Sequence, residues 1–324
     1  MAFSHHFEKT LPLIEDQLSR VFNTPPFSPD GLYDPARYLL ELGGKRLRPA
    51  LTIWVAEHYG KTFEDAIHAA LAVEVFHNFS LMHDDIMDDA PVRRGKPTVH
   101  VRNNVSTAIL SGDAMLVVAY QQLMNYPNPL CGVLMSHFLQ TSLEVCEGQQ
   151  WDMEFQDRDM VSSEEYVNMI RLKTSVLLGE AARLGSLVAG TSDEVASCWY
   201  KFAVSAGLAF QIQDDLLDCF GDSSKTGKQS GGDILVNKKT LLTILAWENS
   251  NEQQKKEAQF IWSLPASVEK IERTLAWYEA TQAKQKTESV RDQYLDEALK
   301  ELSWIEGDTS LFKEMAYLFA HRDH

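Results

Sequence analysis

The segment 63–85, "FEDAIHAALAVEVFHNFSLMHDD", decides the fold class. Its apolar residues recur at steps of three and four, which is the spacing of a helical face, and the pattern continues for about six turns. The stretches 163–190 and 196–220 repeat the pattern, whereas the alternating runs typical of strands are scarce. The sequence therefore predicts an all-α fold.

The breaks between helical stretches are short. "NTPPFSPDGLYDP" (23–35) predicts a loop after a first helix, and "NYPNPL" (125–130) predicts a turn between two helices. The polar segment 221–233 is long enough to form a mobile flap. Ser162 and Glu165 predict a capping box. Because no stretch resembles a linker and no internal repeat is present, we expect a single domain over 1–324.

Composition narrows the class of protein. The chain has 324 residues, 44% of them hydrophobic, and a net charge of −16. Nucleic-acid binding is disfavoured because it needs a basic face, and no apolar run approaches the length of a membrane span. The N-terminus lacks the pattern of a signal peptide, and the four cysteines form no CxxC pair. We expect a cytoplasmic protein without nucleic-acid partners or stable membrane insertion.

Two aspartate motifs with the same spacing interrupt the apolar helices. They are Asp84, Asp85 and Asp88 in "DDIMD", and Asp214, Asp215 and Asp218 in "DDLLD". A solvated acidic face is the ordinary explanation for one such motif, but here the flanks are apolar and the carboxylates repel one another unless cations bind. Magnesium takes one or two carboxylates and completes its shell with water and phosphate oxygens. The two motifs therefore predict a site at which several Mg²⁺ ions bind a diphosphate.

Basic residues suited to phosphate lie near the first motif in the sequence. They are Lys45, Arg46 and Arg48 in "GGKRLRP" (43–49), and Arg93, Arg94 and Lys96 in "PVRRGKP" (91–97). Either group alone could be surface charge, but arginine is suited to bidentate phosphate contacts, and the glycine pair allows close backbone approach. Together with the aspartates they favour two diphosphates, one bound through metal and one bound directly.

Three further residues stand out against their surroundings. His77 precedes Asp84 by two helical turns, so it could reach a phosphate, although a core or surface histidine is the default explanation. Lys173 and Thr174 interrupt the apolar run "MIRLKTSVLL", where a snorkelling lysine is the ordinary alternative.

With these motifs in place, the chain resembles the trans-isoprenyl diphosphate synthases of the polyprenyl synthetase family, most closely the short-chain geranylgeranyl and farnesyl diphosphate synthases. The resemblance extends from "GGKRLRP" to the C-terminal helices. It rests on "DDIMD" with "RRG", "GQQWD" (148–152), "KT" (173–174), "FQIQDDLLD" (210–218) and "TGKQSGGDILVNKKT" (226–240). It implies a bundle of roughly a dozen helices around a central cavity, usually in a homodimer.

The resemblance also implies roles for individual residues. Isopentenyl diphosphate is expected at Lys45, Arg48, His77 and Arg94. The allylic diphosphate (dimethylallyl, geranyl or farnesyl) is expected at Arg93, Lys173, Thr174, Gln211, Lys228 and Lys238. Three Mg²⁺ are expected, with Asp84, Asp88 and Asp214 as principal ligands and Asp85, Asp215 and Asp218 as further partners. Gln149 and Asp152 match family positions near the metals.

The implied reaction adds isopentenyl diphosphate to the cation left when the allylic diphosphate departs. Product length is expected to depend on Phe79, with Phe76 and Ser80 beside it. In the resembling family an aromatic residue at the position of Phe79 goes with short products, and the small residue after it, with no insertion within "DDIMD", favours C20 over C15. Simple core packing is the alternative explanation for Phe79. A class I terpene cyclase and a non-catalytic subunit of a heteromeric synthase are the competing functions.

Overall fold

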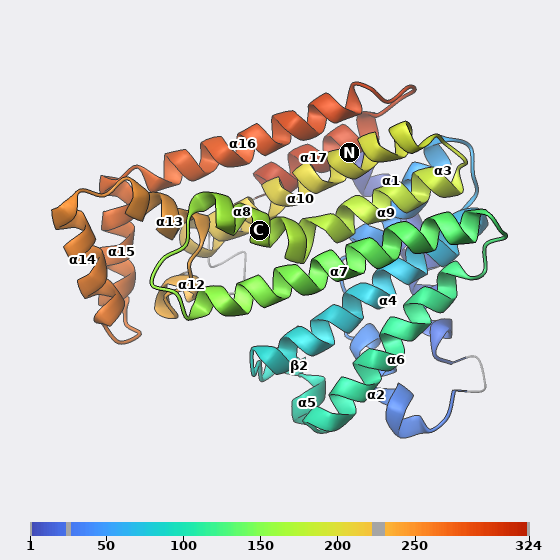
Figure 1. Ribbon diagram of the computed structural model, residues 1–324, viewed down its shortest axis with the longest axis horizontal. Helices are drawn as coiled ribbons and strands as arrows, with labels where there is room; N and C mark the ends of the chain where they lie inside the picture. Colours follow the sequence, from blue (N-terminus) through green and yellow to red (C-terminus); the bar gives the residue numbers. More distant parts are fainter. Residues whose placement is uncertain (1, 24–26, 222–230, 323–324) are drawn as a thin grey trace. The chain divides into compact units, whose positions relative to one another are not determined.

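The computed structural model describes residues 2–23, 27–221 and 231–322. Helices make up most of this part of the chain, and a two-stranded hairpin is the only β-sheet in these ranges (Figure 1). None of the described helices combines the length and apolar composition needed to cross a membrane. The all-α class predicted from the sequence is confirmed.

The chain divides into two compact units. Unit 1 comprises residues 1–142, 177–200 and 305–308, and unit 2 comprises 143–176, 201–304 and 309–324. Helices α7 and α10 contribute residues to both units. The single domain over 1–324 stays a prediction.

Unit 1 is built mainly from the N-terminal helices. Its elements are α1 (Ala2–Val21), α2 (Asp30–Glu41), α3 (Leu47–His58), α4 (Phe63–Met87), β1 (Val92–Arg93), β2 (Lys96–Pro97), α5 (Val99–Arg102), α6 (Val105–Leu123), the first part of α7 (Leu130–Gln156), most of α9 (Val176–Val188) and the start of α10 (Asp193–Phe220). Helix α4 packs against α3 and α6 (Figure 1). It is apolar around most of its circumference, which is typical of a buried helix.

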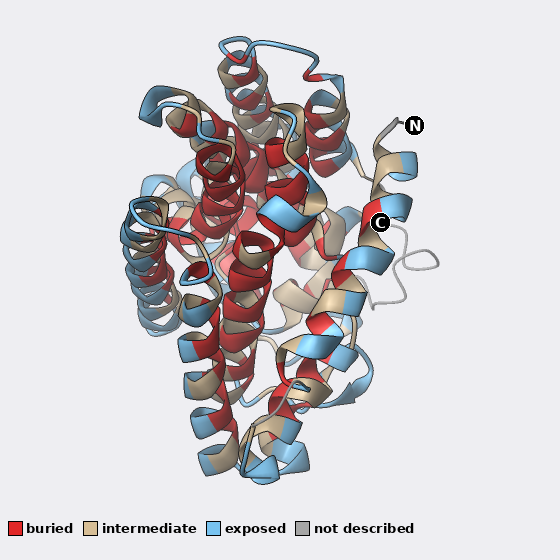
Figure 2. Ribbon diagram, turned by 90° about the vertical axis from the view of Figure 1, so that its right-hand side faces the viewer, coloured by how far each residue is buried: buried red, intermediate tan, exposed pale blue. Residues whose placement is uncertain are grey.

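The start of α4 follows from its sequence. The Thr62 side chain accepts a hydrogen bond from the Asp65 N–H, and the Asp65 carboxylate accepts one from the Thr62 N–H, which completes a capping box. The helix then continues to Met87, just before the last aspartate of the first motif. Many helices bury one side and expose the other (Figure 2), as their periodicity predicts.

Unit 2 carries the second aspartate motif. Its elements are the second part of α7, α8 (Ser163–Ile170), the π-helical turn η1 (Arg171–Ser175), the rest of α10, α12 (Gly232–Leu235), α13 (Leu241–Glu248), α14 (Glu252–Ser263), α15 (Val268–Ala280), α16 (Ala283–Leu302) and α17 (Ser310–His321). Part of its core joins Leu216 on α10 to Leu242, Ile261 and Trp277 on three later helices. This packing fixes the helix that bears the second motif.

The local predictions have different outcomes. The capping box of Ser162 and Glu165 is confirmed at the start of α8, and the turn at 125–130 joins α6 to α7. The loop predicted at 23–35 is wrong over 30–35, because α2 begins at Asp30. Pro35 and Leu39 of α2 are buried one turn apart, and this burial outweighs the proline signal. Of the predicted flap, residues 222–230 lie outside the described part.

Candidate functional site

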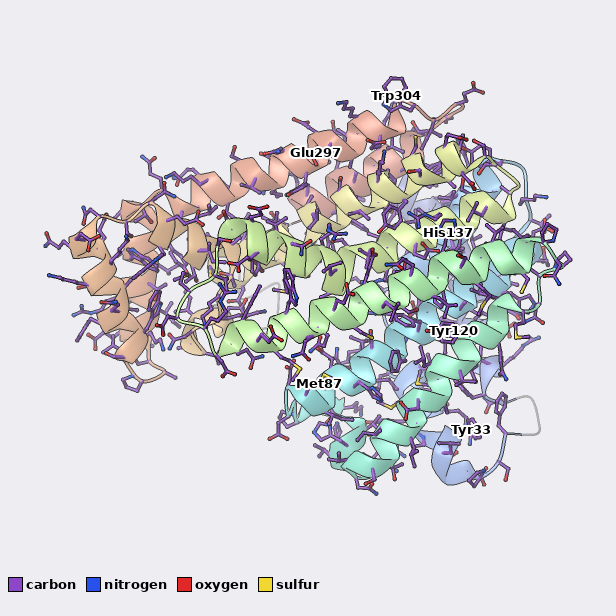
Figure 3. All side chains as sticks on the ribbon, in the orientation of Figure 1. Tyr33, Met87, Tyr120, His137, Glu297 and Trp304 are labelled. Atoms are coloured by element: carbon purple, nitrogen blue, oxygen red, sulfur yellow. The ribbon has the colours of Figure 1, made fainter. Side chains whose placement is uncertain are left out.

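The first aspartate motif closes α4. Asp84 and Asp85 lie in its last turn, and Asp88 caps the helix, with its N–H donating to the Asp84 carbonyl at 2.9 Å. Met87, labelled in Figure 3, marks the end of the helix. The Asp84 side chain is 19% exposed and Asp88 is exposed, whereas the Asp85 side chain is only 3% exposed. The motif therefore offers two accessible carboxylates and buries the third.

Asp85 is held by an arginine of the hairpin. Nε of Arg93 lies 2.9 and 2.8 Å from the two Asp85 oxygens, and its NH2 lies 2.8 Å from Oδ1. The same NH2 is 3.6 Å from Asp84. This fork is the strong geometry for an arginine and a carboxylate, so Asp85 ties β1 to the end of α4.

The hairpin turn positions a second arginine. Arg94 and Gly95 join β1 to β2, and both have positive φ, +51° and +74°. Such values are required in the favoured two-residue hairpin turns. The Arg94 guanidinium donates to the Gly43 carbonyl, and a Cβ on Gly44 would lie 3.0 Å from NH2 of Arg94. Gly44 thus leaves room for Arg94.

Arg48 and His77 form a partly buried pair. NH1 of Arg48 lies 3.2 Å from Nε2 of His77. Burial, followed by the nearby guanidinium charges, holds the pKa of His77 well below its usual range, so the imidazole is neutral. Since Arg48 only donates, His77 accepts at Nε2 and keeps its proton on Nδ1. Nε of Arg48 is buried without a hydrogen bond among the described residues, so the pair offers donors suited to an anion.

Arg46 has a different role from its neighbours in "GGKRLRP". It is buried at a φ of +46° and forms ion pairs with Glu74 at 2.7 Å and Glu15 at 2.8 Å. It also donates to the Leu40 carbonyl at 2.6 Å. Grouping Arg46 with the phosphate-binding cations was therefore wrong, because its charge is used inside unit 1. Lys45 is exposed.

The second aspartate motif lies near the end of α10. The side chain of Asp214 is 43% exposed and forms an ion pair with Arg322, whose guanidinium stacks over the Phe210 ring at 3.8 Å. Asp215 is 2% exposed and accepts hydrogen bonds from the Tyr166 hydroxyl at 2.6 Å and the Leu241 N–H at 3.3 Å. Burial raises the pKa of Asp215 to about 6. As in the first motif, the second aspartate is buried.

Asp218 organises the segment that follows the motif. Its carboxylate accepts a hydrogen bond from the Asp233 N–H at 2.9 Å, and its carbonyl accepts one from the Gly231 N–H at 2.7 Å. Asp233 lies 3.5 Å from Nζ of Lys238. Burial lowers the pKa of Lys238, but the nearby carboxylates outweigh burial and raise it. Lys238 therefore stays cationic.

The "GQQWD" and "KT" segments meet within unit 2. A Cβ on Gly148 would lie 2.2 Å from the Lys173 nitrogen, so only glycine fits beside the π-helical turn. Such turns are frequent at functional sites. Nζ of Lys173 lies 2.6 Å from Asp152, and Thr174 follows in the turn. Nε2 of Gln149 is buried without a hydrogen bond in the described part of unit 2.

Two of the predicted site residues, Gln211 and Lys228, remain to be placed, and three residues with contacts at the site were not predicted. Gln211 lies on α10, one turn before Asp215. Lys228 lies outside the described residues. The sequence analysis did not single out Tyr166, Asp233 or Arg322. Only Asp233 had a signal, since it lies in the quoted segment "GGDILVNKKT".

Phe79 belongs to a column of aromatic rings in unit 1. Its ring is 5.4 Å from that of Phe76, which lies 5.4 Å from the ring of Phe138, and Phe138 lies 5.8 Å from Tyr120, labelled in Figure 3. The Ser80 hydroxyl donates to the His77 carbonyl at 2.8 Å. Phe79 is buried at one end of this column, with 8% of its surface exposed, and Phe76 is more deeply buried, at 1%.

The chemistry of the aspartates fits magnesium. Among the described residues, no three side chains of His, Cys, Asp or Glu are arranged to hold a metal by themselves. Mg²⁺ does not require such a group, because it binds one or two carboxylates and takes its other ligands from water and phosphate. The accessible carboxylates of Asp84, Asp88 and Asp214 are hard oxygen donors of this kind.

Comparison with known proteins gives one consistent family. A model described as polyprenyl synthetase matches residues 29–278. The chain is 39% identical over 301 residues to a geranylgeranyl pyrophosphate synthase from Geoglobus acetivorans, covering 91% of this chain and 92% of that one. It is 43% identical over 226 residues to a geranylgeranyl diphosphate synthase from Methanosarcina mazei, covering 69% and 70%. The crystal structure of geranylgeranyl pyrophosphate synthetase from Pyrococcus horikoshii Ot3 matches with a TM-score of 0.92 and 30% identity, covering 99% of this chain and 100% of that one.

Proposed function

The chain belongs to the polyprenyl synthetase family, and on this basis we propose that it condenses isopentenyl diphosphate with an allylic diphosphate to form a short-chain all-trans product and diphosphate. The relatives named as geranylgeranyl diphosphate synthases favour a C20 product, with C15 as the next choice. The observation that carries the substrate proposal is the partly buried pair of Arg48 and neutral His77, because the buried Nε of Arg48 has no hydrogen bond among the described residues and is suited to an anion.

The proposed binding roles follow the chemistry of each residue. Isopentenyl diphosphate is assigned to Lys45, Arg48, His77 and Arg94. The allylic diphosphate is assigned to Arg93, Lys173, Thr174, Gln211, Lys228 and Lys238. Mg²⁺, up to three ions, is assigned to Asp84, Asp88 and Asp214, with Asp85, Asp215 and Asp218 as supporting carboxylates. Bound there, Mg²⁺ supplies positive charge that stabilises the departing diphosphate.

The chain's own cations then act on the leaving group. The carbon–oxygen bond of the allylic diphosphate breaks, and both electrons leave with the diphosphate. Lys173 and Lys238 stabilise this developing charge, and Asp152 and Asp233 orient their ammonium groups. The double bond of isopentenyl diphosphate attacks C1, a carbon–carbon bond forms, and a proton passes to the released diphosphate. No protein nucleophile takes part.

A purified-protein assay tests the proposal. The protein is incubated with Mg²⁺, isopentenyl diphosphate and dimethylallyl, geranyl or farnesyl diphosphate in turn, and the products are analysed by mass spectrometry. We expect a C20 diphosphate. A terpene cyclase would release a hydrocarbon without consuming isopentenyl diphosphate, and a non-catalytic subunit would be inactive alone, so either result would overturn the proposed reaction.

Two substitutions test the separation of the diphosphates. Arg48→Ala should raise KM for isopentenyl diphosphate by about tenfold or more, because a charged hydrogen bond contributes roughly 1.5–3 kcal/mol. Lys173→Ala should mainly lower kcat, since its charge stabilises the leaving group. Loss of affinity for the allylic substrate in Arg48→Ala would instead reverse the two assignments.

We propose that the protein is a homodimer. Large apolar side chains are exposed on α6 and α7 of unit 1, among them Leu110, Val117 and Leu139. Gathered apolar exposure is typical of a protein interface. Leu110→Lys should shift the molar mass measured by light scattering toward the monomer, whereas Leu13→Lys, at a comparably exposed position on α1, should not. The cytoplasmic location expected from the sequence remains a prediction.

We propose that Phe79 limits product length. It lies five residues before Asp84, and its ring contacts that of the more deeply buried Phe76. Phe79→Ala should lengthen the product by one or more five-carbon units, as measured by mass spectrometry. An active variant with unchanged product length would assign Phe79 to core packing alone.

A further inference from the structure

Helix α6 contains a glycine where its own geometry does not require one. Gly112 lies well inside Val105–Leu123, and its φ is not in the positive range. A glycine in a helix interior costs roughly 1 kcal/mol relative to alanine. The structure gives a reason for it: a Cβ on Gly112 would lie 2.3 Å from Nε2 and 2.6 Å from Cδ2 of His83. The missing side chain makes room for the His83 imidazole.

His83 is held in that space from two sides. Its Nε2 donates to the Ile109 carbonyl of α6 at 3.1 Å, since a carbonyl only accepts. Its ring meets the Phe79 ring edge-to-face, with centroids 4.8 Å apart and planes at 67°. His83 and Phe79 are four residues apart on α4, the spacing at which helical side chains meet. The imidazole therefore stands between Phe79 and the backbone of α6.

We propose that His83, seated over Gly112, is a positioning residue that fixes the ring of Phe79 and thereby sets product length. The inference rests on the proposed prenyl transfer and on Phe79 as its length limit. Phe76 supports one side of the Phe79 ring, and His83 supports another. A methyl group on Gly112 pushes the imidazole away from α6 and toward Phe79. Removal of the imidazole instead leaves a space into which the Phe79 ring can turn.

The two substitutions should therefore change product length in opposite directions. Gly112→Ala should lower the ratio of C20 to C15 product, and His83→Ala should raise the share of products longer than C20, each on the order of fivefold, the scale of one aromatic pair. The double variant is decisive, because Gly112→Ala should have no further effect once the imidazole is gone. Gly31→Ala is the control, because a Cβ there meets open space.

Product ratios and thermal unfolding are measured for all four variants. A Gly112→Ala shift of equal size in the His83→Ala background overturns the inference, since the effect would not pass through the imidazole. Lowered unfolding temperatures with unchanged product ratios also overturn it, because the contact would then serve stability alone. If Gly112→Ala does not fold, an unchanged product ratio in His83→Ala is sufficient to reject the positioning role. Failure of the wild-type protein to form any prenyl diphosphate would instead reject the proposed function itself.

Discussion

The two aspartate motifs have the same spacing, but different partners hold them. In the first motif, the guanidinium of Arg93 forms an ion pair with the second aspartate, Asp85, and lies 3.6 Å from Asp84. In the second, an arginine pairs with the first aspartate, Asp214, whereas Asp215 is buried against a neutral hydroxyl and a backbone N–H. The shared feature is burial of the second aspartate.

This difference separates two roles within one motif. A carboxylate that is buried and already hydrogen-bonded has little capacity left for a metal, so Asp85 and Asp215 are suited to holding structure. The more accessible Asp84, Asp88 and Asp214 are suited to binding ligands. The ion pair of Asp214 with Arg322 places a competing cation at one of these three carboxylates.

The largest effect is expected at the accessible aspartates. Asp84→Ala, Asp88→Ala and Asp214→Ala should each lower kcat by about 10³-fold, because each removes charge stabilisation of the leaving group. The unfolding temperature should change little. Steady-state kinetics with saturating Mg²⁺ measure the effect, and near-normal turnover in any variant would remove that residue from the metal ligands.

The next largest effect concerns stability at Asp85. Asp85→Ala leaves the partly buried Arg93 without its forked partner, and we expect a loss of about 3 kcal/mol in unfolding free energy. Denaturant unfolding without Mg²⁺ measures it, with Asp84→Ala as the matched control. Equal losses in the two variants would contradict the division of roles within the first motif.

A pH dependence of stability is expected from Asp215. Because burial raises the pKa of Asp215 to about 6, the unfolded chain releases this proton first. The unfolding free energy should therefore fall as pH rises from about 4 to about 6, by on the order of 2–3 kcal/mol. Tyr166, Lys238 and Asp233 surround the carboxyl and contribute to its pKa.

Asp215→Asn removes the titrating group, so the difference between wild type and this variant isolates its contribution. Denaturant midpoints of the Mg²⁺-free protein at pH 4, 5, 6 and 7 provide the measurement. A difference that stays constant over this range would show that burial does not raise the pKa of Asp215.

Sequence periodicity predicted the elements whose signals are local. The length of α4, the box at Ser162 and the class of the fold all follow from spacing within a few turns. The start of α2 was missed because Pro35 reads as a breaker, whereas its burial is a tertiary effect. A local pattern is sufficient to predict a helix when the residues that determine its position lie within the helix itself.

The partners of the candidate site could not be predicted in this way. Arg322 meets Asp214 across 108 positions in the chain, and no spacing links them. The π-helical turn at Lys173 depends on the missing side chain of Gly148, which lies on another helix. In the sequence, Arg46 and Arg48 belong to the same basic segment and could not be told apart. The ion pairs of Arg46 with Glu15 and Glu74 place it in the interior.

The smallest effect is expected at Arg322, where it tests the second motif directly. Its guanidinium pairs with Asp214, so a metal ion at this carboxylate must compete with it. The pair is partly exposed and contributes roughly 0.2–1 kcal/mol, so Arg322→Ala should tighten Mg²⁺ binding about threefold in the absence of diphosphate. Isothermal titration calorimetry measures this affinity. Arg291→Ala is the control, because it removes the same charge from α16, where Arg291 contacts Asp292 and Gln213. Equal Mg²⁺ affinities in the two variants would mean that Arg322 acts only through net charge, and the two motifs would then differ in their buried aspartates alone.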